Sequence, residues 1–262
     1  MLKFKNCKFF STLLLKNKTA IITGGSDGIG KSTVLRFAEE GANVIIADIN
    51  EEKGEKLSEE INNKFNNKNL TKFIKCDISN ENDCKNLSEK TVEFYNNIDI
   101  LINNAGIFIL KGVENFSKED FMKILETNVV GTALVSKYAI EHMKKNKKSS
   151  IVNLGSISSF IAQEGFMTYS ATKAALLQMT KNMALDLNKY NIRVNCVCPG
   201  TIVTSALINF AKENGLTVED IEKEHWNRSI MGRFGDPKEV ADTILYLASD
   251  QSSYITGTHL SV

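Results

Sequence analysis

A tyrosine and a lysine stand one helical turn apart in the segment YSATK, at Tyr169 and Lys173. If the segment is helical, the two side chains lie on one face. A lysine ammonium beside a phenol favours the phenolate and lowers the tyrosine pKa. A tyrosine tuned in this way can exchange a proton with an alcohol or a carbonyl near neutral pH. The pair predicts acid–base chemistry, although the same spacing is also common on exposed helices.

A glycine-rich segment, TGGSDGIG at 23–30, lies between an apolar run and a helical pattern. Glycines let the backbone turn sharply and let a pyrophosphate approach the helix N-terminus. In this strand–turn–helix context the segment predicts dinucleotide binding. Asp48 ends the next apolar run, where a carboxylate can accept both ribose hydroxyls of NAD and repel the 2′-phosphate of NADP. An aspartate that caps the next helix is the structural alternative.

The elements that must position these residues alternate along the chain. Apolar runs predict strands at 19–23, 43–48, 71–77, 99–103, 150–156 and 192–198, with a final run at 254–262. Helical patterns cover 31–40, a stretch from Glu51, 117–145, 166–189 and 236–249, whereas 201–229 fits poorly and is interpreted as an insertion. This alternation predicts a parallel sheet with helices on both faces.

Composition favours one globular domain and excludes some partners. The chain has 262 residues, of which 42% are hydrophobic, and its net charge is +1. Balanced charge gives no sign of a nucleic-acid or membrane partner, and no segment has the ~18 uninterrupted apolar residues of a spanning helix. Five cysteines do not form a disulfide framework. Cys196 and Cys198 are interpreted as core thiols rather than a metal site, and we expect no metal.

Residues 1–17 are expected to form an N-terminal extension, and 18–262 a single NAD-binding catalytic domain. The first 18 residues contain five lysines and no acid. A mitochondrial presequence is one interpretation, but such segments are rich in arginine and this one has none. A short surface extension of a cytoplasmic protein is the other.

Further motifs follow in order: CDI at 76–78, NNAG at 103–106, Asn128, Ser156 and CPGTIVT at 198–204. With TGGSDGIG and YSATK, they resemble the short-chain dehydrogenase/reductase family in order and spacing, from Lys18 to Val262. The chain is most similar to NAD-dependent members such as dihydroanticapsin dehydrogenase and glucose 1-dehydrogenase. It is also similar to 3-oxoacyl carrier-protein reductases, which usually prefer NADP. The resemblance implies a doubly wound, seven-stranded parallel Rossmann-type sheet in an α/β, three-layer αβα fold.

The resemblance also implies a role for each matching residue. Tyr169 is the expected general acid/base, Lys173 lowers its pKa and holds the nicotinamide ribose, and Ser156 hydrogen-bonds the substrate oxygen. Asn128 is expected to hold a water in a proton relay through Lys173. In oxidation the phenolate takes the alcohol proton while the carbinol hydride passes to the nicotinamide.

The implied cofactor site is larger. Asp77 and the Ile78 backbone are expected beside the adenine, Asn103 near the adenine ribose, and Ile202 and Thr204 at the nicotinamide carboxamide, whereas Asn104 is expected to tie strands together. The full expected set for NAD is Gly24, Ser26, Asp27, Gly28, Ile29, Gly30, Asp48, Ile49, Asp77, Ile78, Asn103, Ala105, Gly106, Tyr169, Lys173, Pro199, Gly200, Ile202 and Thr204.

The substrate is expected to be a small-molecule alcohol or ketone, and the sequence leaves a steroid, a sugar, an acyl thioester and a small secondary alcohol open. Its pocket is predicted near Phe108, Gln163 and Phe166, with a lid that contains Leu207, Phe210 and Trp226. An NADP-dependent 3-oxoacyl carrier-protein reductase-like enzyme is the main alternative. A non-catalytic dinucleotide-binding regulator is disfavoured because both Tyr169 and Lys173 are present, and an epimerase because such enzymes carry GxxGxxG.

Assembly is expected to follow the family. Members usually form tetramers by pairing long helices, here 117–145 and 166–189, so a homotetramer is expected. Members also continue past the last strand with Asp-Gly-Gly and a short tail, whereas this sequence ends at HLSV. A homodimer is the alternative if this difference weakens the second interface.

Overall fold

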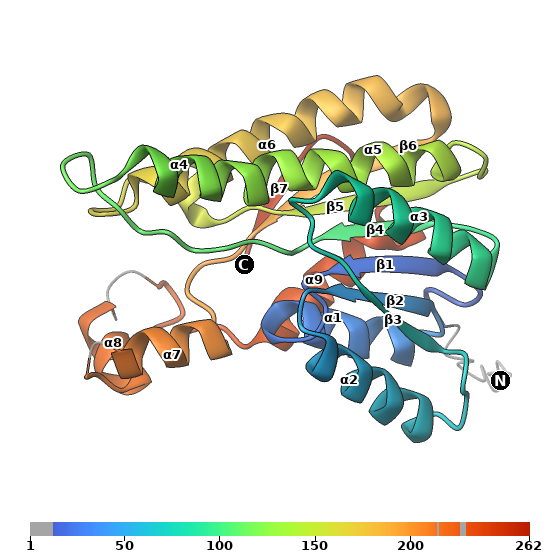
Figure 1. The fold of residues 1–262 in the computed structure, drawn as a ribbon, viewed down its shortest axis with the longest axis horizontal. Helices are drawn as coiled ribbons and strands as arrows, with labels where there is room; N and C mark the ends of the chain where they lie inside the picture. The colour runs from blue at the N-terminus through green and yellow to red at the C-terminus, as the bar shows by residue number, and fades with distance from the viewer. Residues whose placement is uncertain (1–12, 214, 226–228) are drawn as a thin grey trace, which may run out of the picture.

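The protein was analysed as a computed structural model, which describes residues 13–213, 215–225 and 229–262. Seven parallel strands form one sheet in the order β3-β2-β1-β4-β5-β6-β7 (Figure 1). The strands are β1 (Thr19–Thr23), β2 (Asn43–Asp48), β3 (Thr71–Lys75), β4 (Ile100–Asn103), β5 (Ser149–Leu154), β6 (Ile192–Cys198) and β7 (His259–Ser261). All seven coincide with predicted apolar runs, which confirms the doubly wound α/β fold.

Helices cover both faces of the sheet in three layers (Figure 1). One face packs against α1 (Gly28–Glu39), α2 (Glu51–Lys64) and α9 (Pro237–Ala248), through residues such as Phe37 and Ile61. The opposite face packs against α3 (Glu81–Tyr95), α5 (Thr132–Met143) and α6 (Met167–Leu187), through residues such as Leu87 and Val135. Because both faces are covered, the strands are almost continuous apolar runs.

Strand register brings the chemistry-bearing residues to one edge. Thr23 pairs with Ala47 across β1 and β2, and Asn103 pairs with Asn153 across β4 and β5. The carboxyl ends of these parallel strands therefore lie at the same edge. The sheet order reverses between β1 and β4, and in open α/β sheets ligands bind at such a switch point.

The helix expected over 117–145 is interrupted. It consists of α4 (Lys118–Leu125), a six-residue π-helical segment η1 (Glu126–Gly131) and α5. The side-chain pattern continues through all three elements, so sequence periodicity did not reveal the change in backbone hydrogen bonding. Such π-helical segments are rare and are frequent at functional sites.

The segment interpreted as an insertion folds into two short helices in its described part. These are α7 (Ser205–Glu213) and α8 (Val218–His225), which pack together around Ala211, Ile221 and Phe234. In Figure 1 they stand apart from the three layers. The short 3₁₀ helices are η2 (Ile157–Ser159), η3 (Asn188–Tyr190) and η5 (Asp250–Ser252).

Residues just before Lys18 pack on the domain. Leu15 is 1% exposed within the core, and its N–H donates to the Glu40 carbonyl oxygen at 3.0 Å. The remainder of the predicted extension, including Cys7, lies outside the described residues. In the described part of the chain, no helix has the length and apolar character needed to span a membrane.

Candidate active site

The glycine-rich turn joins β1 to α1 at the carboxyl edge of the sheet. Gly24 and Gly28 have positive φ angles of 62° and 53°, which glycine adopts without strain. A Cβ atom on Gly30 would lie 1.9 Å from the Gly24 carbonyl oxygen. The turn leads directly into α1, whose first N–H groups favour an anion. Gly24, Gly28 and Gly30 thus form the close backbone turn that a pyrophosphate group requires.

The end of β4 holds this turn in place. The Thr23 hydroxyl accepts hydrogen bonds from the N–H groups of Asn104 and Ala105, each at 3.1 Å. The Asn104 side-chain amide donates to the carbonyl oxygens of Thr23 and Gly24, at 2.9 and 3.0 Å. Asn104 therefore joins the two strands at the switch point.

Asp48 lies at the end of β2, and both of its carboxylate oxygens accept hydrogen bonds from backbone N–H groups. One oxygen accepts from the Ser26 N–H and the other from the Asn50 N–H, each at 3.0 Å. The N-cap of α2 is Asn50, whose side-chain oxygen accepts from the Lys53 N–H at 3.0 Å. Asp48 is therefore not the residue that caps α2, and its carboxylate remains beside the glycine-rich turn. Ile49 is 66% exposed next to it.

The expected adenine side of the site is formed by the turn after β3. Asp77 is exposed, and its carboxylate accepts from the Ser79 N–H at 2.9 Å. Ile78 is 5% exposed, and its carbonyl oxygen accepts from the Cys84 thiol at 3.2 Å. These contacts fix the turn and leave the Asp77 side chain at the surface.

The Asn103 side chain is buried, so only the backbone of this residue is left for the expected position near the adenine ribose, which stays a prediction. The side-chain amide donates to the Ser136 hydroxyl at 3.0 Å and to the Asn153 side-chain oxygen at 2.8 Å. The side chain is 3% exposed, because residues of a strand alternate between faces and this one is directed into the layer between the sheet and α5. It ties β4, β5 and α5 together.

The segment after β6 crosses over the glycine-rich turn. The Pro199 carbonyl oxygen accepts from the Ile157 N–H at 3.0 Å, and the Gly200 N–H donates to the Val262 carbonyl oxygen at 2.7 Å. A Cβ atom on Gly28 would lie 3.4 Å from the Thr204 methyl carbon. Ile202 is 8% exposed and packs in the core, so its backbone rather than its side chain borders the crevice.

Three of the four expected catalytic residues converge. Ser156 follows β5, whereas Tyr169 and Lys173 lie one turn apart in α6. The Ser156 hydroxyl hydrogen-bonds the Tyr169 phenol. The Lys173 ammonium donates to the Leu154 carbonyl oxygen at 2.7 Å and lies 5.6 Å from the centroid of the Tyr169 ring. The sheet and α6 thus bring a hydroxyl, a phenol and an ammonium to one place.

Burial controls the ionisation of this group. It raises the pKa of Tyr169, and the hydrogen bond with Ser156 acts in the opposite direction. Burial lowers the pKa of Lys173 to about 8, while the neighbouring Cys196 and Cys198 thiols act to raise it. Desolvation therefore dominates at both groups in the protein alone, and the expected lowering of the Tyr169 pKa by Lys173 stays a prediction.

Asn128 lies in the π-helical segment η1 and is 1% exposed. Its side-chain oxygen accepts from the Ile107 N–H at 2.8 Å, and its amide donates to the Ile107 carbonyl oxygen at 3.0 Å and to the Thr172 hydroxyl at 3.2 Å. The side-chain oxygen and amide nitrogen both bind Ile107 and the amide also binds Thr172, and the expected water-mediated relay from Asn128 to Lys173 stays a prediction. Asn128 braces the loop after β4 against α6, beside Gly106.

Aromatic residues surround the phenol. The rings of Phe108 and Tyr169 are stacked with centroids 4.8 Å apart, and Phe166 meets Tyr169 edge-on at 6.3 Å. Gln163 accepts a hydrogen bond from the Ser158 hydroxyl at 2.6 Å. Phe108 and Phe166 thus adjoin Tyr169, whereas Gln163 contacts Ser158, two residues after Ser156. Of the predicted lid, Leu207 and Phe210 lie on α7, and Trp226 lies outside the described residues.

Comparisons with known proteins agree with this arrangement. A family model described as enoyl-(acyl carrier protein) reductase matches residues 24–262. An uncharacterized oxidoreductase of Thermotoga maritima is 40% identical over 94% of this chain and 96% of its own. The chain belongs to the short-chain dehydrogenase/reductase family. This short-chain dehydrogenase is therefore an oxidoreductase that acts on CH–OH groups and binds a nicotinamide dinucleotide.

Relatives of the short-chain dehydrogenase differ in substrate. A 3-oxoacyl-[acyl-carrier-protein] reductase of Thermotoga maritima is 37% identical over 95% of this chain and 97% of its own. An L-fucose dehydrogenase of Bos taurus is 35% identical, with coverage of 94% and 87%. The ligand-free structure of Thermoplasma acidophilum aldohexose dehydrogenase superposes with a TM-score of 0.84 at 34% identity, with coverage of 95% and 93%.

Several contacts in the site are not predicted by any sequence motif. The stacking of Phe108 on Tyr169 and the bonds of Asn128 to Ile107 and Thr172 depend on the tertiary fold.

Cys196 and Cys198, with sulfur atoms 3.7 Å apart, are buried free thiols as expected. Within the residues that the structure describes, no three His, Cys, Asp or Glu side chains cluster to hold a metal ion.

Proposed function

We propose that this protein is an NAD-dependent oxidoreductase that interconverts a secondary alcohol and a ketone. The observation that carries the proposal is the convergence of Ser156, Tyr169 and Lys173 at the edge of the sheet that also holds Asp48 and the glycine-rich turn. An acid–base group beside a dinucleotide crevice is what a hydride-transfer enzyme needs.

The described residues fit a bound dinucleotide. The turn at Gly24 to Gly30 allows close approach of a pyrophosphate, and the Asp48 carboxylate would bind the adenosine ribose hydroxyls. Asp77 and Ile78 would border the adenine, and the backbone from Pro199 to Thr204 would border the nicotinamide. When bound, NAD supplies the hydride acceptor for oxidation of the alcohol.

Side chains of the protein itself carry out the proton transfer. In oxidation, the deprotonated Tyr169 oxygen takes the proton of the substrate hydroxyl, and in reduction the phenol returns a proton to the carbonyl oxygen. Ser156 donates a hydrogen bond to the same substrate oxygen, so it stabilises negative charge there. Lys173 is held by its hydrogen bond to the Leu154 carbonyl oxygen, which keeps its positive charge close to the phenol.

Asp48 favours NAD over NADP. Its carboxylate is fixed by two backbone N–H groups, so it cannot easily swing away from an added 2′-phosphate. The NADP-dependent 3-oxoacyl carrier-protein reductase-like alternative is supported by the 37% identical relative of that name. That alternative requires a preference for NADP, which a carboxylate at this position opposes by charge repulsion.

Assembly and location are part of the proposal. Val130 on η1 is 48% exposed and Leu185 on α6 is 79% exposed, which supports pairing of the long helices in a homotetramer. The bacterial relatives favour a cytoplasmic location over a mitochondrial one. We propose no nucleic-acid or membrane partner.

A panel of secondary alcohols and ketones tests the function. Each substrate is assayed by the absorbance of reduced nicotinamide, with NAD and NADP in parallel. The proposal expects turnover of at least one secondary alcohol with NAD favoured over NADP. A preference for NADP with 3-oxoacyl thioesters as the best substrates would establish the alternative instead.

A further inference from the structure

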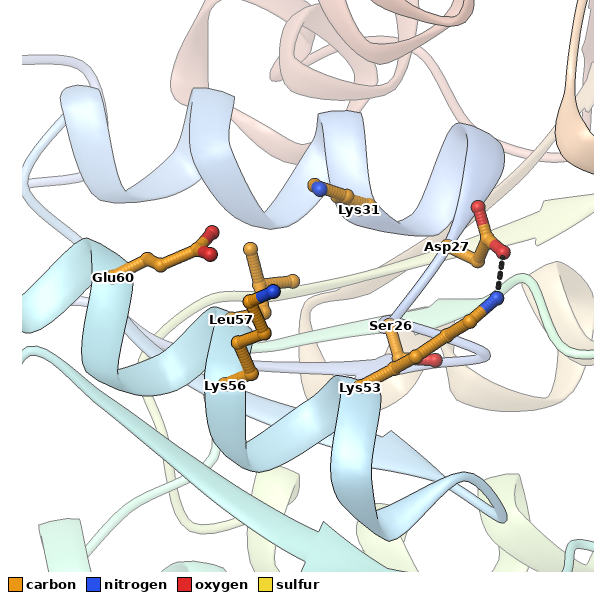
Figure 2. Close-up of a pocket in the computed structure, with 7 residues that line it drawn as sticks. All are labelled: Ser26, Asp27, Lys31, Lys53, Lys56, Leu57 and Glu60. Atoms are coloured by element: carbon orange, nitrogen blue, oxygen red, sulfur yellow. Dashed lines mark hydrogen bonds and ion pairs between the residues drawn. The ribbon is translucent and has the colours of Figure 1, made fainter.

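A cavity of about 280 Å³ lies between α1 and α2, next to the expected ribose site (Figure 2). It is rich in charged side chains, with three lysines and two carboxylates. Its lining residues are Ser26, Asp27, Lys31, Lys53, Lys56, Leu57 and Glu60.

The cavity is linked to Asp48 through Ser26. Ser26 lines it, and the Ser26 N–H donates to one Asp48 oxygen at 3.0 Å. The other Asp48 oxygen accepts from the Asn50 N–H, and Asn50 caps the helix that carries Lys53. A ribose bound by Asp48 would therefore have its 2′-position close to this cavity.

One lysine of the cavity is neutralised by the glycine-rich turn. The Lys53 ammonium lies 2.6 Å from an Asp27 oxygen, across the gap between the turn and α2 (Figure 2). The other Asp27 oxygen accepts from the Gly28 N–H at 2.7 Å, which fixes the carboxylate as the N-cap of α1. In the described part of the chain, Lys31 and Lys56 form no ion pair, so Lys53 is the cavity lysine with a dedicated partner.

The pKa of Lys53 agrees with its ion pair to Asp27. Asp27 raises the pKa of Lys53 through the hydrogen bond and its charge, and Asp48 contributes in the same direction. Both carboxylates thus act on one ammonium at the border of the cavity. A 2′-phosphate, which carries about two negative charges, would have to compete with both of them for Lys53.

We infer that Asp27 is a second cofactor-selecting residue, which holds Lys53 away from a 2′-phosphate and so supports the choice of NAD made by Asp48. The inference rests on the proposed function. Without the Asp27 charge, Lys53 joins Lys31 and Lys56 as a free cation beside the 2′-position. The cavity then becomes a phosphate-binding site, since ammonium groups bind phosphate through charge-assisted hydrogen bonds.

Asp27→Asn tests the inference because asparagine is an equally good N-cap and keeps α1 intact. The measurement is calorimetric binding of ADP-ribose and of 2′-phospho-ADP-ribose to the purified full chain, which needs no turnover. Relative to the wild type, the affinity ratio should shift about two- to fivefold toward the 2′-phospho ligand, as expected for one partly exposed charge. Asp27→Asn combined with Lys53→Met should lose most of that gain.

Glu39→Gln is the matched control. Glu39 pairs with Lys64 at 3.1 Å between the same two helices, and both pairs have similar exposure: 54% and 41% for Lys53 and Asp27, 55% and 42% for Lys64 and Glu39. Because Glu39 does not line the cavity, its removal should leave the affinity ratio unchanged.

An unchanged ratio in Asp27→Asn, or a gain that survives the added Lys53→Met change, would overturn the inference. The change in affinity ratio between the variant and the wild type tests the role of Asp27. The affinity ratio of the wild type tests the proposed use of NAD. The two proposals can therefore fail separately.

Discussion

The ammonium of Lys173 lies 5.6 Å from the centroid of the Tyr169 ring, and each residue is 6% exposed. Burial moves the two pKa values in opposite directions, because each charged form is disfavoured when water is removed. In the protein alone, Tyr169 is therefore a phenol at neutral pH and Lys173 is close to its titration. This relationship makes both stability and activity depend on pH above 7.

Lys173→Met should change the pH dependence of stability. The folded pKa of Lys173 is about 8 against an ordinary value of 10.5, so between these values the unfolded wild type binds more protons and its stability rises with pH. Methionine does not titrate, so the variant lacks this pH-dependent contribution to the free energy of unfolding. Relative to the wild type, the free energy of unfolding of the variant should fall by about 1–3 kcal/mol between pH 7 and pH 10.5. Chemical denaturation at both pH values measures it.

Lys181→Met is the control for that experiment, since Lys181 lies on the same helix and is exposed. It should shift stability equally at both pH values. A pH-independent effect of Lys173→Met would show that Lys173 has an ordinary pKa in the folded protein.

Phe108→Ala should move the pH profile of oxidation to lower pH. Phe108 is stacked on Tyr169 and is itself 61% exposed, so its removal admits water to the phenol. Because burial is the main cause of the raised Tyr169 pKa, hydration lowers that pKa and the phenolate forms earlier. The measurement is kcat/KM for alcohol oxidation against pH. Phe116→Ala, which removes an aromatic ring that pairs with Phe121 instead, should leave the profile in place.

The strands and the order of site residues were predictable because their signals are local. β1 and β2 are runs of apolar residues bounded by turn signals, and the Tyr169–Lys173 spacing follows from one helical turn. Helix α3 was not predicted, although Asn80 caps it and Cys84, Leu87, Ser88 and Thr91 form its buried face. That face contains few strongly apolar residues, so its periodicity was weak.

Tertiary contacts explain the site features that could not be predicted. The Asn128 side chain in the π-helical segment hydrogen-bonds Ile107 and Thr172, both distant in sequence. The direction of the Asn103 side chain depends on which face of β4 meets α5. The raised pKa of Tyr169 depends on burial by Phe108 and its neighbours, which the spacing to Lys173 does not encode.

Asp48→Ala and Asp48→Arg should narrow or reverse the preference for NAD. Both changes remove a carboxylate that accepts from Ser26 and Asn50, and arginine adds a partner for a 2′-phosphate. The ratio of kcat/KM for NAD to that for NADP should fall at least about tenfold, as expected for a lost charge repulsion and two ribose hydrogen bonds. A wild-type enzyme that already prefers NADP would contradict this role of Asp48.

The assembly is predicted to be a homotetramer, or a dimer if the interface that involves α9 and β7 is weak. Exposed apolar side chains on the long helices, such as Leu185, would be covered by a partner. Light scattering at micromolar concentration measures the mass of the assembly. A monodisperse and active monomer would refute this prediction and leave the catalytic proposal intact.

Turnover by Tyr169→Phe tests the central proposal most directly. The change removes the ionisable hydroxyl and little volume, so the stacking with Phe108 should persist. We expect turnover with NAD to fall at least ~10²-fold while NAD binding, measured by calorimetry, stays within about twofold of the wild type. Near-normal turnover in a folded Tyr169→Phe protein would contradict the proposal that Tyr169 moves the proton.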